Sequence, residues 1–434
     1  MLDVRTSQRV SATRVLLVWS ALIAIAFIWG RILAPTHHGL YLGAPPFWSR
    51  WRFDPSVRII PALVLGGVAV RYGRDLARSL RWNALLGATA LASWAWAAAM
   101  AYLNGPHALT DPLSIQRFDY LQTAAKITSL HRYLSQFVDK IATYNQHTIG
   151  HPPAMVVTEW LMFRLGIASP GWNAILVVSG GVLAGLAALI SLRDVAGEEM
   201  ARQAAPFVAF VPAVLWWQTA DAFYAGVSAT AIMLLVLASG RTGRRADAYA
   251  LAGGLLFGFT LFLSYGLAPL FLLPTVVCIA RRTFRPLIVA SIGILAWFAT
   301  FAGYGFSWFA GFAATRHEYW IGAASQRPYS YFLFADLAVL AIATGPAAAV
   351  AIARLRDRRV GWLVGGVLAV VALSDLSGMS KGEVERIWLP FVPWAMLATA
   401  IVGSGRQSER VARTWLALQI ASTLALALAI PSLW

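Results

Sequence analysis

Acidic, basic and histidine side chains gather in four short polar segments of a chain that is otherwise strongly hydrophobic. A carboxylate at the mouth of a cavity can take a proton from a hydroxyl group, and lysine or arginine can bind a phosphate. Histidine can bind an anionic group by hydrogen bonding or charge pairing. The four segments are TDPLSIQRFDY (110–120), HTIGHPP (147–153), TRHEYW (315–320) and SKGEVERIW (380–388).

The first segment offers two candidate catalytic bases, Asp111 and Asp119. Either acid could deprotonate a hydroxyl group if burial raised its pKa toward neutrality. Each also has a structural alternative, because Thr-Asp-Pro is a common turn or helix cap and Asp119 stands where it could cap a following helix. The sequence leaves open which of the two is the base.

The second segment contains His147 and His151, which are candidate substrate-binding residues. Residues four apart share one face of a helix, but Gly150 and the pair Pro152-Pro153 exclude a helix across the motif. Two histidines without a third ligand are a weak signal for a metal. We therefore expect no metal site and no cofactor, and we interpret the histidines as partners of an anionic group. A structural role for one of them is the alternative.

The third segment and the apolar stretch after it supply further candidates. Asp336 lies about two turns inside that stretch, where an acid is costly and usually faces a cavity or a partner. It is a candidate substrate-binding residue, with a buried polar contact between helices as the alternative. Five more substrate-binding candidates lie in the third segment or between it and the start of the stretch: Arg316, His317, Glu318, Arg327 and Tyr329.

The fourth segment places Lys381, Glu383, Glu385 and Arg386 within six residues, just before another apolar stretch. Lysine and arginine suit a phosphate or diphosphate, and arginine can offer two parallel donors. The glutamates could orient these bases or bind sugar hydroxyls. A solvated loop is the alternative, but the concentration of charge favours a binding site.

The composition predicts an integral membrane protein along its whole length. Of the 434 residues 59% are hydrophobic and only 12% are charged, and the mean hydropathy is +0.64. About 20 residues cross a bilayer as a helix, so the fold class expected is an all-α, polytopic transmembrane helical bundle of about 13 spans. The single cysteine, Cys278, excludes a disulfide framework. The expected spans are 14–34, 57–71, 83–103, 172–193, 204–219, 221–240, 248–264, 266–281, 286–303, 330–353, 360–376, 388–404 and 412–431.

The charges of the joining segments predict how the chain crosses the membrane. With the N-terminus in the cytoplasm, the cytoplasmic segments hold 22 of the 35 Lys and Arg but 8 of the 19 acids, a net charge of +14 against +2 outside. The positive-inside rule requires this bias. We therefore expect a multi-pass protein of the plasma (inner) membrane with all four polar segments on the extracytoplasmic face. Since the basic excess is a topological signal, no nucleic-acid partner is expected.

A polar loop of about fifty residues, 104–153, interrupts the spans. Within it, residues 120–144 have apolar positions every three or four residues, which predicts an amphipathic helix. The following stretch, 154–166, is apolar but too short to span, so we expect it to lie in the interface or to re-enter. We predict one transmembrane domain over 1–434, with an outer loop of two juxtamembrane helices at 104–166. The loop also holds Lys126 and Lys140, which with Lys381 are the only lysines of the chain.

Two stretches carry a resemblance to known proteins. GHPP at 150–153 and GEVERIWLPF at 382–391 resemble segments of uncharacterised actinobacterial integral membrane proteins. A large acidic outer loop, a Pro-Pro step and a long series of spans are similar to the GT-C superfamily of membrane glycosyltransferases. Protein O-mannosyltransferases, the aminoarabinose transferase of lipid A and actinobacterial arabinosyl- and mannosyltransferases belong to it. The resemblance covers about residues 83–404, and it departs from the usual pattern in that Asp111 and Asp119 are not adjacent.

The resemblance implies a GT-C-like fold and a membrane glycosyltransferase. Such an enzyme moves a sugar from a polyprenyl-phosphate-linked donor to a glycan or lipid acceptor of the cell envelope, on the outer face of the bilayer. Asp119 or Asp111 would then be the base that deprotonates the acceptor. The groups implied to stabilise the departing lipid phosphate are Arg386, Lys381, His151 and Arg327.

A transporter or flippase of a lipid-linked or anionic substrate is the alternative. It would use Asp336, Asp221 and the outer charges as a pathway, and it should place ionisable residues near the middle of the membrane. The sequence offers few such residues and concentrates its polar groups toward one face, which favours the transferase. A non-catalytic lipid-binding partner in envelope assembly is a third hypothesis.

Overall fold

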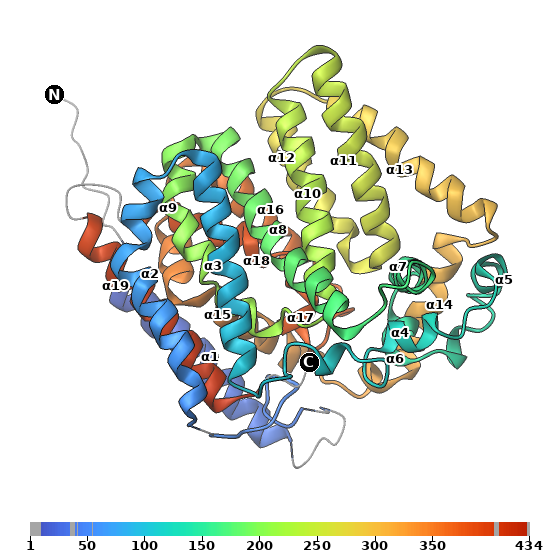
Figure 1. Ribbon diagram of the computed structural model, residues 1–434, viewed down its shortest axis with the longest axis horizontal. Coiled ribbons are helices and arrows are strands. Elements are labelled where there is room, and N and C mark those ends of the chain that lie inside the picture. The colour runs from blue at the N-terminus through green and yellow to red at the C-terminus, as the bar shows by residue number, and fades with distance from the viewer. Residues whose placement is uncertain (1–9, 35–39, 41, 54, 403–407, 432–434) are drawn as a thin grey trace.

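The computed structural model describes residues 10–34, 40, 42–53, 55–402 and 408–431, and its regular secondary structure there is helical (Figure 1). Nine helices of this described part are long and apolar enough to cross a membrane. The prediction of an all-α polytopic bundle is confirmed. The nine are α1 (Ala12–Leu33), α3 (Trp82–Tyr102), α8 (Pro170–Ala196), α10 (Ala220–Ser239), α11 (Gly243–Leu263), α13 (Arg285–Gly303), α15 (Tyr329–Arg354), α16 (Arg358–Leu376) and α19 (Ser408–Ala429).

The other four expected spans are helical but charged, short or interrupted. The helix at 57–71 extends as α2 (Ile60–Ser79) into a charged end. The other three contain Pro206, Pro212, Pro269 and Pro393, and proline removes a backbone donor and breaks regular helix. They form α9 (Glu198–Ala209) with η5 (Pro212–Trp216), η6 (Tyr265–Phe271) with α12 (Leu272–Ala280), and α18 (Val392–Met396) with η8 (Leu397–Ile401).

Helices α8 and α10 pack backbone against backbone through glycine. A Cβ added at Gly180 would lie 2.5 Å from the carbonyl oxygen of Ala222, and one added at Gly226 would lie 2.6 Å from the carbonyl oxygen of Gly180. Small residues permit the close packing that drives association of helices in membranes. The contact fixes the first turn of α10, which contains Asp221, against α8.

The two ends of the bundle differ in structure and charge. The turns from α2 to α3 and from α10 to α11 lie at the upper end in Figure 1, which we call the basic end. The four polar segments lie with short helices at the lower end, which we call the polar end; that it is extracytoplasmic stays a prediction. Its helices are α4 (Asp119–Ala124), α5 (Leu130–Ser135), α6 (Gln146–Gly150), α7 (Ala154–Arg164), α14 (Trp308–Ile321) and α17 (Val384–Ile387).

Residues 120–144 do not form the one amphipathic helix expected from their periodicity. They form α4, α5 and the 3₁₀ turn η4 (Ile141–Thr143). The side chain of Ser129 accounts for the break, because it accepts a hydrogen bond of 3.3 Å from the backbone N–H of Arg132 and so caps the start of α5. The next stretch does form a helix, α7, which packs on α4.

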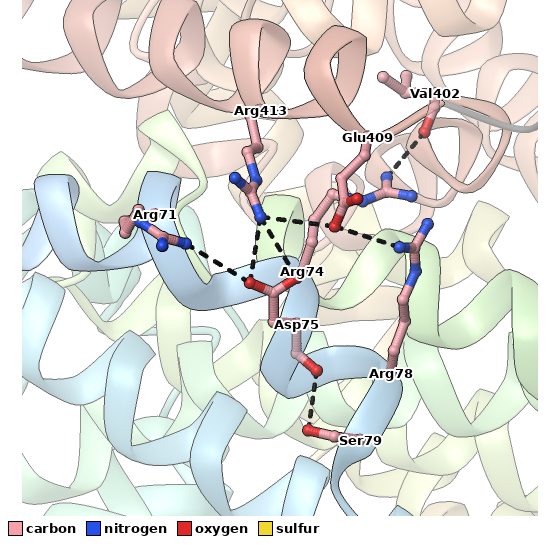
Figure 2. Close-up of polar contacts among 8 residues, drawn as sticks. All are labelled: Arg71, Arg74, Asp75, Arg78, Ser79, Val402, Glu409 and Arg413. Atoms are coloured by element: carbon pink, nitrogen blue, oxygen red, sulfur yellow. Dashed lines mark hydrogen bonds and ion pairs between the residues drawn. The ribbon is translucent and has the colours of Figure 1, made fainter. Parts of the chain in front are cut away.

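Ion pairs join α2 to α19 at the basic end (Figure 2). Arg413 Nη2 lies 3.1 Å from Asp75 Oδ2 and 3.5 Å from Glu409 Oε1. Arg78 Nη1 lies 3.2 Å from the same oxygen of Glu409, and Arg71 approaches Asp75 at 3.8 Å. The side chains involved are 31% to 62% exposed, so each pair contributes little to stability.

Arg74 is the buried member of this group and is only 4% exposed. Its Nη1 donates a hydrogen bond of 3.2 Å to the carbonyl oxygen of Val402, which follows η8 (Figure 2). A buried carbonyl that loses its donor is left with the cost of its desolvation. Arg74 therefore fixes η8 against α2.

The change Arg74→Met should lower the thermal unfolding midpoint of the purified protein more than Arg78→Met does. The first variant loses a buried, charge-assisted hydrogen bond that is worth roughly 1–3 kcal/mol, whereas the second loses one exposed ion pair of at most about 1 kcal/mol. Thermal unfolding in detergent, followed by tryptophan fluorescence, measures both. Equal shifts would contradict the role assigned to Arg74.

Candidate active site

The carboxylate of Asp119 joins the first and second polar segments. Asp119 is the first residue of α4, and its Oδ2 accepts a hydrogen bond of 2.7 Å from the backbone N–H of His147. Its Oδ1 accepts one of 3.3 Å from Thr148 Oγ1, and His147 Nδ1 lies 3.6 Å from Oδ2. Because the first N–H groups of a helix have no partner within the helix, the Asp119 carboxylate caps α6 from 28 residues away.

The environment of Asp119 suits a base. Burial raises the pKa of its carboxyl, and this effect outweighs that of the hydrogen bonds and of the Arg386 charge, which lower it. The side chain is 11% exposed, so the carboxylate is enclosed without being sealed from a substrate. A carboxylate with a raised pKa is a stronger proton acceptor at neutral pH.

Helix α6 ends at Gly150, so His147 is helical whereas His151 is extended, with φ −135° and ψ 156°. Extended backbone is what the following Pro152 favours. As expected, no helix runs across the motif from one histidine to the other. The double proline leads into α7, which begins at Ala154.

Both histidines are neutral at neutral pH. Burial lowers the pKa of His147 to about 3 and that of His151 to about 4, and the positive charge of Arg386 adds to the effect in each case. The His151 ring packs against Tyr120, with ring centroids 6.0 Å apart, and against Tyr224 at 5.6 Å. Its Nδ1 is buried and has no hydrogen-bond partner among the described residues.

Arg386 lies at the centre of a buried ion network made by α17 and α10. Its Nη1 donates to Asp221 Oδ2 at 3.0 Å and its Nη2 to Glu383 Oε2 at 2.8 Å. Glu383 Oε1 in turn accepts from Arg327 Nη2 at 3.1 Å. All four side chains are at most 11% exposed. Two guanidinium groups and two carboxylates therefore compensate one another away from water.

The charges of this network shift one another's pKa values. Burial raises the pKa of Glu383, but Arg386 and Arg327 outweigh that effect and hold it at about 2. Burial lowers the pKa of Arg386, but the negative charges of Asp221 and Glu383 raise it by more, so its pKa lies above the usual value. Both side chains thus stay charged at physiological pH.

The backbone before α17 is held in an unusual conformation. Gly382 and Glu383 have φ values of +82° and +61°, in the left-handed region. A Cβ at Gly382 would lie 2.7 Å from the Phe332 ring, so both the space and the backbone angle require glycine. Asp336 Oδ1 accepts a hydrogen bond of 3.3 Å from the Gly382 N–H. This contact corresponds to the structural alternative for Asp336.

Lys381 packs against Arg327 and α14. The Arg327 Nη1 donates to the Lys381 carbonyl oxygen at 2.6 Å, and Lys381 Nζ donates to the Arg327 carbonyl oxygen at 3.1 Å. The Nζ atom also lies 4.8 Å from the centroid of the Trp320 ring. Burial lowers the pKa of Lys381, and the Arg327 charge lowers it further.

Glu385 is hydrogen-bonded to the segment before α2. Its Oε1 accepts a hydrogen bond of 3.1 Å from the backbone N–H of Trp48, and its Oε2 is buried without a partner among the described residues. Burial raises its pKa to about 7. This position suits a structural link better than the sugar-binding role expected for it.

Several expected site residues do not join the buried network. Asp111 is exposed at the start of the 3₁₀ turn η3 (Asp111–Leu113), as a turn residue would be. On α14, Arg316 and His317 are exposed and Glu318 is half-buried. The hydroxyl of Tyr329, on a side chain at the surface, donates to the Leu376 carbonyl oxygen at 3.0 Å.

Four residues that the sequence did not single out for the predicted site contact its candidate residues in the structure: Asp221, Tyr120, Tyr224 and Thr148. Asp221 had a sequence signal, since it is an acid in the first turn of a predicted span, but the sequence placed it only in the transport hypothesis. The described residues contain no group of three or more His, Cys, Asp or Glu side chains arranged to hold a metal ion.

The structure aligns in part with two solved structures of membrane proteins. ArnT from Cupriavidus metallidurans, solved in the apo state, aligns with a TM-score of 0.44 and 16% identity over 75% of this chain and 60% of its own length. The oligosaccharyltransferase of Archaeoglobus fulgidus, in complex with zinc and sulfate, aligns with a TM-score of 0.38 and 16% identity over 79% and 52%. The chain thus spans less than two thirds of either protein. No protein-family model and no curated protein sequence matches it.

The stability of the protein should fall with acidification partly because of His151. The unfolded state binds a proton on this histidine as the pH falls below about 6.5, whereas the native state does so only near pH 4. His151 therefore favours the unfolded state increasingly from pH 6.5 downward, and this penalty is absent above that pH.

Between pH 7 and pH 5 the protein should lose roughly 1–2 kcal/mol more stability than the variant His151→Phe. Phenylalanine keeps a ring between Tyr120 and Tyr224 but cannot be protonated. Thermal unfolding over this pH range is the measurement, with the exposed His317→Phe as control. Parallel curves for the protein and His151→Phe would show that His151 does not resist protonation.

Proposed function

We propose that the chain is a membrane glycosyltransferase of the GT-C type, with Asp119 as its general base. It moves a sugar from a polyprenyl-phosphate-linked donor to an acceptor of the cell envelope at the polar end of the bundle. One observation carries the proposal: a partly enclosed carboxylate with a raised pKa, Asp119, lies within the electrostatic reach of the buried Arg386 network. Such a transfer needs a base for a hydroxyl and polar or cationic groups for a phosphate, and Asp119 lies close to candidates for the second role that are named below.

The reaction requires one bond to form as another breaks. The acceptor hydroxyl gives its proton to the Asp119 carboxylate while its oxygen bonds to the anomeric carbon of the sugar. The bond from that carbon to the phosphate oxygen breaks, and its electron pair leaves with the polyprenyl phosphate. Positive groups that are already in place stabilise this charge without having to reorganise.

The residues of the network divide this work. Arg386 is paired with two carboxylates, so its main task is to hold α17 in place against α10 and to contribute positive electrostatic potential at the site. Buried nitrogen atoms that lack a partner among the described residues include Arg327 Nε and His151 Nδ1. We assign these two residues, together with Lys381, to the phosphate of the donor.

The distribution of charge within the spans favours transfer over transport. In the nine described spans, Asp194, Asp221, Asp375 and Glu409 lie within two residues of a helix end, and Asp247 lies four residues from the start of α11. Asp336 is the deepest, seven residues from the start of α15, or about 10 Å at 1.5 Å per residue. Its carboxylate accepts a hydrogen bond from the Gly382 N–H at the polar end. A transport pathway would need ionisable groups farther along the helices.

The orientation proposed puts this chemistry outside the cytoplasm. The arginine-rich turns of the basic end lie opposite the site, and such turns stay in the cytoplasm. We therefore place the protein in the plasma membrane with a cytoplasmic N-terminus. The donor and the acceptor then meet on the extracytoplasmic face, within reach of the lipid.

The variant Asp119→Asn should lose at least about 100-fold in transfer rate, because an amide cannot take the acceptor proton. Asparagine still accepts the hydrogen bond from the His147 N–H, so folding should be preserved. Asp111→Asn, at the exposed aspartate, is the matched control and should keep its rate within about twofold. Purified protein would be given polyprenyl-phosphate-linked sugars, and release of polyprenyl phosphate would be measured.

Thermal unfolding of both variants checks that they are folded. Full turnover by Asp119→Asn would exclude Asp119 as the base. Failure of the unmodified protein to consume any polyprenyl-phosphate-linked sugar, in the presence of envelope extracts as acceptor, would contradict the transferase proposal itself.

A further inference from the structure

A cationic pocket lies at the polar end, next to Asp119 but outside the buried network. Its volume is about 300 Å³, at the lower end of the range for small-ligand sites. Lys126, Arg132 and Lys140 line it, and no acid does. Two of the three lysines of the chain are thus gathered around one hollow. Three like charges around one hollow repel one another and favour an anion between them.

The pocket also has a rigid aromatic wall. Tyr133 lines it, is 8% exposed, and carries a buried hydroxyl with no hydrogen-bond partner among the described residues. Its ring is fixed edge-on against Phe137 at 5.6 Å and packs against Tyr144 at 5.8 Å. These ring contacts hold Tyr133 in place as one side of the pocket, and its hydroxyl oxygen is covered by protein atoms.

The wall of the pocket reaches Asp119 through two hydrogen bonds. Thr123 lines the pocket, and its Oγ1 lies 3.2 Å from Thr148 Oγ1, which donates to Asp119 Oδ1 at 3.3 Å. Asn145, another lining residue, directly precedes α6, which Asp119 caps. A molecule in the pocket would therefore lie beside the proposed base.

We propose that this pocket binds an anionic sugar, one bearing a carboxylate or a phosphate, as part of the acceptor glycan. That the sugar belongs to the acceptor rests on the proposed transferase function; that the pocket binds it does not. The three cations pair with the charge, and the lining serine, threonine and asparagine side chains pair with sugar hydroxyls. Among the lining residues only Ile127 has an aliphatic side chain, so the pocket has no slot for the acyl chain of a phospholipid.

Binding is measured by saturation-transfer NMR on the full chain in phosphatidylcholine nanodiscs. The probes are glucuronic acid, glucose 6-phosphate and, as the neutral match, glucose. We expect both anionic sugars to bind and glucose to bind at least about tenfold more weakly. The double variant Lys126→Gln/Lys140→Gln should lose at least about tenfold in affinity for the anionic sugars.

The control variant is Arg117→Gln, an exposed cation of the polar end that does not line the pocket, and it should bind as the unmodified protein does. Equal binding of glucose, or unchanged affinity in the double variant, would overturn the proposal. So would displacement of the sugars when phosphatidylglycerol replaces phosphatidylcholine, since that outcome assigns the pocket to a lipid headgroup.

The experiment separates this proposal from the proposed function. Asp119→Asn should bind the anionic sugars normally, because binding needs no proton transfer. If the sugars bind but the protein consumes no polyprenyl-phosphate-linked donor, the transferase proposal fails and the pocket stands. If transfer occurs and its rate does not change in Lys126→Gln/Lys140→Gln with any acceptor, the pocket is not an acceptor site.

Discussion

The buried pairing of Arg386 with Asp221 and Glu383 is the constraint on which the polar end depends. A charge taken out of water must be compensated, and removal of one member of a buried pair typically costs about 3–5 kcal/mol. The network therefore fixes where α17 sits relative to α10, and α10 is in turn fixed to α8 by the glycine contacts. Through Glu383 it also holds Arg327, which leads into α15. Segments separated by up to 165 residues share one electrostatic centre.

The left-handed backbone before α17 follows from the same constraint. Glu383 must present both carboxylate oxygens to two different guanidinium groups, one from its own helix and one from the segment before α15. With a negative φ at Glu383, the carboxylate would point in another direction and could not reach both guanidinium groups. The strain of positive φ at Glu383 is small beside the cost of an uncompensated buried charge.

The sequence predicted the class of fold and the gathering of the polar segments at one end of the bundle, because both depend on composition and on local charge. Apolar stretches of span length and the basic turns needed no tertiary information. The joining of Asp119 to the HTIGHPP motif, and of Arg327 to Glu383, follows from the collection of polar residues at one end of the bundle. The sequence could not choose between Asp111 and Asp119, since both occupy good capping contexts and only burial separates them.

Other features depend on packing that the sequence does not show. The periodicity of 120–144 arises from short helices that are buried on one side. Ser129 separates α4 from α5, because its side chain caps the start of α5 and a continuous helix would lose that bond. Arg316 and His317 share a polar segment with Tyr319, yet only the tyrosine reaches the Lys381 backbone. The pairing of Arg386 with Asp221 could not be predicted, because Asp221 lies 165 residues away at the start of a span whose orientation is set only in the folded bundle.

The capping of α6 by Asp119 has a consequence for the order of events during turnover. A carboxylate is a strong acceptor for a backbone N–H, and a protonated carboxyl is a weaker one. If Asp119 takes the acceptor's proton, the hydrogen bond to His147 weakens at that moment, and the single turn of α6 loses part of what holds it. Helix α6, with His147 and Thr148, would then be held more firmly before proton transfer than after it.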